Sequence, residues 1–96
     1  MPFAIVLAPE AVEDLKRLKA AVRGTVKDAM ETHLRHEPEK TSRSRIKRLR
    51  GLSRPQYRLR VSDIRVFYDV AEGIVEVLAI VPKSETAAWL AQFGKL

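Results

Sequence analysis

Three strand-like segments separated by two-residue polar turns constrain the fold of this chain more than any other feature. Connections of two polar or glycine residues between apolar segments are typical of β-hairpins. The pattern therefore predicts an antiparallel meander whose faces the rest of the chain must cover. The segments are PQYRLRV (55–61), IRVFYDV (64–70) and IVEVLAIV (74–81), with Ser62-Asp63 and Glu72-Gly73 between them.

The remaining elements follow from apolar spacing and from residues that begin or end helices. Apolar residues recur at helical intervals from Ala11 to Val22 and from Val26 to Leu34, so Gly24 is expected to separate two helices. A final helix is expected to be capped by Ser84 and ended by Gly94. The expected elements are a strand at 3–8, helices at 9–22 and 25–36, a loop at 37–45, a strand at 46–51, the three meander strands and a helix at 85–93.

The resulting order, β-α-α-β-β-β-β-α, predicts an α+β fold. Two N-terminal helices are expected to pack on a twisted antiparallel sheet, with a short C-terminal helix completing the structure. A chain of 96 residues with 46% hydrophobic content is large enough for one core and too small for two. A single domain over residues 1–96 is therefore expected.

Composition excludes several kinds of site. The chain has no cysteine, which removes disulfides, thiolate nucleophiles and cysteine-based zinc sites. His33 and His36 lack the carboxylate neighbours that would complete a metal site, so neither a metal nor a cofactor is expected. No run of 18 apolar residues exists, and the N-terminus lacks the charged start of a signal peptide. A cytoplasmic protein with no membrane partner is expected.

The positive charge of the chain is concentrated in one block. The net charge is +6, and the segment from Lys40 to Arg65 holds ten of the eighteen basic residues but only one acid, Asp63. A concentrated basic block indicates a polyanionic partner, and nucleic acid is the commonest polyanion in a cytosol.

Strand alternation assigns the residues of the meander to two faces. Because side chains alternate along a strand, the first turn pairs Arg60 with Arg65 and places three arginines on one face. Carried across the second turn, the same alternation pairs Arg65 with Ile80 and Phe67 with Leu78. The face expected against the two helices holds Leu59, Val61, Ile64, Val66, Val75, Val77, Ala79 and Val81. The opposite face holds Arg58, Arg60, Arg65, Phe67, Leu78 and Ile80.

The opposite face is expected to form a groove for an anion. The C-terminal helix, with Trp89, Leu90 and Phe93, would cover its apolar part, and Arg48 and Arg50 on the neighbouring strand would extend its basic part. Like charges directly opposite one another destabilise a sheet, whereas guanidinium groups match phosphate oxygens. Alternating arginines are also ordinary on the solvent face of a strand. The density of basic residues approaching the hairpin favours the groove.

The segments IKRLRG, YRLRVSDIRVFYDV and VEVLAIVPKSE, in this order and preceded by MPFAIVLAPEAVEDLKRL, resemble the RelE/ParE superfamily of bacterial toxin-antitoxin toxins, more closely its RelE branch. The resemblance runs from about Phe3 to Leu90. It implies a small α+β toxin neutralised by an acidic cognate antitoxin. RelE-like members enter the ribosomal A site and cut mRNA without a metal. ParE-like members instead inhibit DNA gyrase and lack the nuclease residues.

The resemblance also implies roles for particular residues. Two strand arginines, the arginine of the next strand and the lysine after the last strand match the basic positions of the nuclease, so the expected catalytic set is Arg58, Arg60, Arg65 and Lys83. Ser84 stands where a further arginine is expected and Leu90 where a tyrosine is expected. Lys47, Lys83 and Glu85 are the candidates for proton transfer. The expected nucleic-acid-binding residues are Lys47, Arg48, Arg50 and Arg54, and the expected antitoxin-binding residues are Trp89, Leu90 and Phe93.

Three functions follow from these expectations. The first is a ribosome-dependent mRNA endoribonuclease, with the ribosome and mRNA as partners. The second is a non-enzymatic inhibitor of DNA gyrase. The third is a weakened relative that binds its antitoxin and, through that complex alone, operator DNA.

Overall fold

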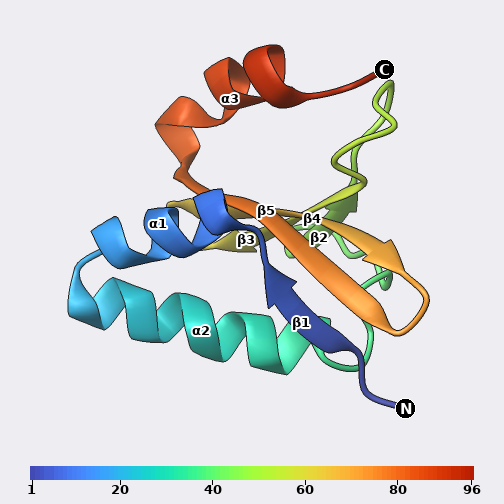
Figure 1. Ribbon diagram of the computed structural model, residues 1–96, viewed down its shortest axis with the longest axis horizontal. Coiled ribbons are helices and arrows are strands. Elements are labelled where there is room, and N and C mark those ends of the chain that lie inside the picture. The colour runs from blue at the N-terminus through green and yellow to red at the C-terminus, as the bar shows by residue number, and fades with distance from the viewer.

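The computed structural model describes all 96 residues and contains five strands and three α-helices (Figure 1). None of the three helices combines the length and the apolar character that a membrane-spanning segment needs. The elements are β1 (Ala4–Leu7), α1 (Pro9–Arg17), α2 (Ala20–Leu34), β2 (Ile46–Arg48), β3 (Tyr57–Val61), β4 (Ile64–Ala71), β5 (Ile74–Pro82), a short 3₁₀ turn (Lys83–Glu85) and α3 (Thr86–Phe93).

The strands form one sheet in the order β1-β5-β4-β3-β2. The four C-terminal strands form the expected antiparallel meander, whereas β1 pairs with β5 in parallel. The α+β fold and the order of elements are confirmed, and the sheet is mixed rather than wholly antiparallel. The parallel pair is possible because two helices and three strands separate β1 from β5, which gives the chain ample length to cross over.

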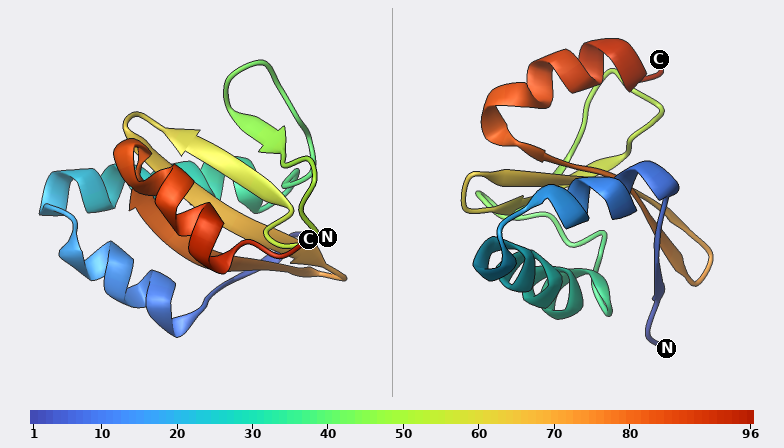
Figure 2. Two further views of the ribbon diagram at one scale, coloured as in Figure 1. Left: turned by 90° about the horizontal axis from the view of Figure 1, so that it is seen from above. Right: turned by 60° about the vertical axis from the view of Figure 1, so that its left-hand side comes forward.

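Helices cover both faces of the sheet (Figures 1 and 2). Ala11 of α1 and Val26, Met30 and Leu34 of α2 pack against one face and form the main hydrophobic core. On the other face α3 covers a smaller cluster around Phe67. This second face also carries the arginines of the hairpin.

The break between the two N-terminal helices falls earlier than the sequence suggests. α1 ends at Arg17, and Leu18 adopts an extended conformation with its side chain against the main core. Gly24, expected to separate the helices, lies inside α2. A side chain at this position would point into open space. Glycine in a helix interior costs about 1 kcal/mol relative to alanine, which α2 tolerates because its packed residues lie on the other side.

A β-bulge changes the register of the last hairpin. Tyr68 pairs with Val77 as expected, but Phe67 pairs with Ala79, so Leu78 is an extra residue on β5. Beyond the bulge the faces exchange. Ile80 therefore joins the main core, whereas Ala79 and Val81 join Phe67 under α3, which corrects the expected faces of these residues.

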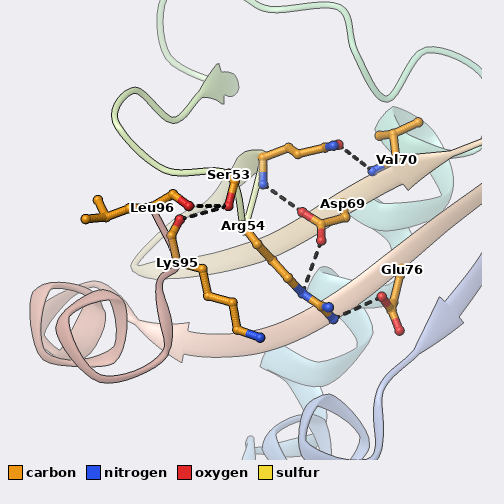
Figure 3. Close-up of polar contacts among 8 residues, drawn as sticks. Ser53, Arg54, Asp69, Val70, Glu76, Lys95 and Leu96 are labelled. Carbon is orange, nitrogen blue, oxygen red and sulfur yellow. Dashed lines mark hydrogen bonds and ion pairs between the residues drawn. The ribbon is translucent and has the colours of Figure 1, made fainter.

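Polar contacts fix the C-terminal tail and the loop before β3 to the sheet (Figure 3). The Ser53 hydroxyl donates to the carbonyls of Lys95 and Leu96 at 3.2 and 2.9 Å. Arg54 forms ion pairs with Asp69 of β4 at 3.3 Å and with Glu76 of β5 at 3.2 Å. These contacts hold the end of the chain, and with it the end of α3, against the sheet.

Candidate nucleic-acid interface

Four cations from three neighbouring strands share the sheet face that α3 leaves uncovered. Lys47 of β2 lies directly opposite Arg58 of β3, and Arg60 of β3 lies directly opposite Arg65 of β4. Residues directly opposite in an antiparallel pair lie on the same face, and so do residues two apart in a strand. We call Lys47, Arg58, Arg60 and Arg65 the basic face. None of the four forms an ion pair with a carboxylate.

Arg58 lies at the centre of the basic face and is partly desolvated. Its Nη1 is buried without a hydrogen-bond partner. Burial, and then the positive charges of Arg65 and Arg60, lower the pKa of Arg58 below its ordinary value. The folded protein thus holds this guanidinium in an environment that disfavours its charge, which an anion bound on the face would offset.

Arg65 is buried, although alternation assigns it to the face that is expected to form an open groove. Only 8% of the residue is accessible, and its Nη1 donates to the carbonyls of Ser62 at 2.8 Å and Ile64 at 3.1 Å. These hydrogen bonds stabilise the hairpin turn, in which Ser62 has a positive φ of 52°. Its charge contributes to the basic face, whereas exposed Arg60 has a guanidinium free of hydrogen bonds to the protein.

The C-terminal helix forms an apolar wall beside the basic face. Trp89 stacks on Phe67 with ring centroids 4.9 Å apart and planes 5° apart, and Leu90 packs against the same cluster. Phe93 is 52% exposed and tilts against Trp89 at 5.5 Å. Of the three expected antitoxin-binding residues, only Phe93 is exposed; Trp89 and Leu90 are partly buried. Leu90, at the position expected for tyrosine, packs into the wall and carries no polar group.

Lys83 lies beside the turn of the β3–β4 hairpin. Its backbone N–H donates to the Asp63 carbonyl at 2.7 Å, and its side chain is exposed. Ser84 lies inside the 3₁₀ turn and does not cap α3; Glu85 occupies the N-cap position, with no side-chain capping bond. Thr86 instead donates its hydroxyl to the Lys83 carbonyl at 2.9 Å. The expected Ser84 cap is therefore wrong.

Of the other expected nucleic-acid-binding arginines, Arg48 lies on the opposite face of the sheet and Arg54 is engaged in ion pairs. Arg48 is directly opposite Tyr57, on the face of the main core, and its guanidinium lies 5.1 Å from the centre of the Tyr57 ring. Arg50 is exposed in the turn after β2. Arg54 is engaged by Asp69 and Glu76 (Figure 3). The expectation that Arg48 extends the groove is wrong, because alternation along β2 brings Lys47 to the basic face instead.

Arg45 is a residue that sequence reasoning did not single out. The N–H of Arg60 donates to the Arg45 carbonyl at 2.8 Å, so pairing with β3 begins one residue before the start of β2. Arg45 and Arg60 line a common polar hollow with Ser44 and Ser62. Extending the hairpin register to the preceding strand is the signal that would have identified Arg45.

The basic face can bind and polarise a phosphate group but holds no carboxylate or imidazole for proton transfer. No group of three or more potential metal-ligating side chains exists in the chain. His33 lines a second hollow at the C-terminal end of α2, which Arg45 also lines, and burial followed by the charge of Arg45 lowers the pKa of His33. The arrangement therefore supplies electrostatic stabilisation of an anion more completely than acid–base chemistry.

Comparison with solved structures identifies the same architecture in RelE toxins. RelE in the RelE–RelB complex of Pyrococcus horikoshii is 23% identical, with a TM-score of 0.70 over 86% of this chain and 97% of that chain. The chain from the RelBE2 complex of Mycobacterium tuberculosis is 20% identical, with a TM-score of 0.73 over 85% and 99%. A free, doubly mutated RelE from E. coli is 21% identical, with a TM-score of 0.68 over 93% and 92%. At these identities the likeness establishes the fold.

The family is established by sequence. No curated protein matches the chain. Residues 5–87 match the sequence model of a family described as the ParE toxin of the type II toxin-antitoxin system parDE. The match spans β2 to β5, both N-terminal helices and all of β1 except Ala4, and it confirms the expected RelE/ParE superfamily. The chain therefore belongs to the ParE toxin family and is the toxin of a type II toxin-antitoxin module.

Proposed function

We propose that this toxin acts on RNA: it binds mRNA on the ribosome through the basic face and cleaves it. The observation that carries the proposal is the grouping of Lys47, Arg58, Arg60 and Arg65 on one face without a carboxylate partner. Such a grouping destabilises the free protein and is offset when phosphate groups bind. The RelE-like fold of the structural neighbours supports the proposal.

The proposed reaction is attack of a ribose 2′-oxygen on the adjacent phosphorus. The 2′-oxygen loses its proton, the bond from phosphorus to the 5′-oxygen breaks, and the 5′-oxygen takes up a proton. Arg58 and Arg60 would stabilise the extra negative charge on the phosphate. An arginine is too basic to remove the 2′ proton. We assign proton transfer to Lys47, on the face itself, or to Lys83, beside the hairpin turn.

Inhibition of DNA gyrase by binding alone is the second candidate. Two observations favour it: the matching family is named for ParE, and the positions expected for the nuclease arginine and tyrosine hold Ser84 and Leu90. In this alternative the basic face would contact the topoisomerase or its DNA, and no residue would need to transfer a proton.

One expression experiment separates the two functions. Cells that express the toxin under tight control are followed by growth, by mapping of mRNA 5′ ends, and by the supercoiling of a reporter plasmid. We expect growth arrest with new mRNA ends and unchanged supercoiling. Arg60→Gln should abolish the growth arrest and the new mRNA ends. Lys27→Gln, which removes an exposed charge on α2, should abolish neither. Intact mRNA with relaxed plasmids would establish the second candidate, and normal growth with soluble toxin would indicate a weakened relative.

We also propose that an acidic antitoxin segment neutralises the toxin. The neighbouring structures of P. horikoshii and M. tuberculosis are toxin-antitoxin complexes. In this chain, the unpaired cations of the basic face and the exposed ring of Phe93 offer charge and apolar surface to such a segment. Contact with operator DNA would then occur through the complex. Co-purification of the toxin with the product of an adjacent acidic reading frame tests this proposal.

A further inference from the structure

A small polar hollow lies at the end of the β3–β4 hairpin, beside the basic face. Four residues line it, Ser44, Arg45, Arg60 and Ser62, and its volume is about 210 Å³. We propose that the hollow is a phosphate subsite, which takes one phosphodiester group of the RNA strand bound on the basic face. The choice of RNA as the source of that phosphate rests on the proposed function.

Backbone contacts hold the two sides of the hollow together. The N–H of Arg60 donates to the Arg45 carbonyl at 2.8 Å, which joins the loop before β2 to the hairpin. The N–H of Arg45 donates to the Ser42 hydroxyl at 3.0 Å, which shapes that loop. Ser62 begins the hairpin turn with a φ of 52°. The hollow is thus built by two segments that lie far apart in the sequence.

The charges and donors around the hollow fit a phosphate group. No acidic residue lines the hollow, and neither Arg45 nor Arg60 forms an ion pair. Guanidinium groups present forked donors that match phosphate oxygens, and the two serine hydroxyls add further donors. Arg60 lines the hollow and also belongs to the basic face, so one extended RNA strand can contact both.

The subsite is tested first with inorganic phosphate, without RNA. Phosphate is titrated into the ¹⁵N-labelled full chain at constant ionic strength, and the backbone amides are followed by NMR. We expect saturable shifts at Ser44, Arg45 and Arg60, and an affinity about tenfold lower in Arg45→Gln, the loss typical of a charge-assisted hydrogen bond. Arg43→Gln removes the same charge from the same loop without touching the hollow and should change the affinity less than twofold. Absence of saturable shifts, or equal losses in both variants, would overturn the subsite.

The source of the phosphate is tested with a labelled nine-nucleotide single-stranded RNA, 2′-O-methylated to prevent cleavage. Affinity is measured by fluorescence anisotropy across a salt series. Loss of one phosphate contact lowers the slope of log affinity against log salt by about 0.7, which we expect for Arg45→Gln but not for Arg43→Gln. Identical slopes would overturn RNA as the source. If the wild type binds phosphate but no RNA, RNA as the source of the phosphate is overturned while the phosphate subsite stands; mapping of mRNA ends in cells tests the proposed function separately.

Discussion

Replacing Arg58 by methionine should make the protein more stable while removing its activity. Arg58→Met keeps an unbranched side chain of similar length and removes a guanidinium whose Nη1 is buried without a partner. It also removes a positive charge directly opposite Lys47. Burial, and then the charges of Arg65 and Arg60, lower the pKa of Arg58. The folded state therefore disfavours the charged guanidinium, which agrees with a gain in stability when the charge is removed.

The magnitude follows from these two effects. Like charges directly opposite in a sheet destabilise it by about 0.2–1 kcal/mol. An unpaired buried donor costs about 1–3 kcal/mol, and the exposure of the rest of the Arg58 side chain reduces this figure because solvent screens it. We therefore expect the free energy of unfolding to rise by about 0.5–1.5 kcal/mol, a net gain after both terms are discounted.

Urea unfolding followed by Trp89 fluorescence measures this change. The chain has a single tryptophan, and its stack on Phe67 makes its emission sensitive to unfolding. Salt should stabilise the wild type more than the variant, because the Debye length falls from about 10 Å at 0.1 M to about 3 Å at 1 M. Arg43→Met, in an exposed loop, is the control and should change stability little. A variant less stable than the wild type, with the same salt dependence, would refute the reasoning.

Two further predictions concern packing and pH. Trp89→Ala should lower the free energy of unfolding by about 2–3 kcal/mol, because Trp89 covers Phe67. Phe93→Ala should lower it by less than about 1 kcal/mol, because Phe93 is half exposed. Circular dichroism during urea unfolding measures both changes, and equal losses would contradict the packing of α3. Tyr68→Phe should lower the free energy of unfolding by about 1 kcal/mol at pH 7, because the Tyr68 hydroxyl donates to the buried Pro38 carbonyl at 2.6 Å. Burial raises the pKa of Tyr68, so its contribution is complete below about pH 10 and is lost as pH rises further. The variant should therefore lose less stability than the wild type between neutral and strongly alkaline pH, and an unchanged alkaline loss would contradict this role.

The first hairpin could be predicted residue by residue because its geometry is local. Alternation with a period of two and a two-residue turn leave one register, and the expected pairing of Arg60 with Arg65 is confirmed. In the second hairpin the same reasoning fails beyond the Tyr68–Val77 pair, counted from the turn, because the extra residue Leu78 exchanges the faces of β5 from Ala79 onward. The residues around Leu78 are apolar on both sides, so no change in pattern marks the bulge.

The ion pairs and hydrogen bonds of individual arginines could not be predicted from the sequence, because they depend on how the folded chain places each side chain. Arg54 forms ion pairs with Asp69 and Glu76 only because β4 and β5 lie beside the loop before β3. Arg65 turns back to two backbone carbonyls of its own turn, which buries a residue that alternation places in solvent. Composition and alternation thus located the basic face, but they did not show which arginines bind other groups of the protein and which remain unpaired. Activity lost in Arg65→Ala would therefore combine a folding defect with a binding defect, which makes Arg60 the better probe.

Cleavage of mRNA by purified components tests the central claim most directly. Ribosomes programmed with a labelled mRNA are mixed with purified toxin, and the RNA ends are mapped. We expect the wild type to cut the message in the ribosomal A site, Arg60→Gln to cut it about 100-fold more slowly, the loss typical of removing one donor to a developing anion, and Lys27→Gln to cut it at the wild-type rate. An intact message with wild-type toxin at concentrations that arrest growth would contradict the account.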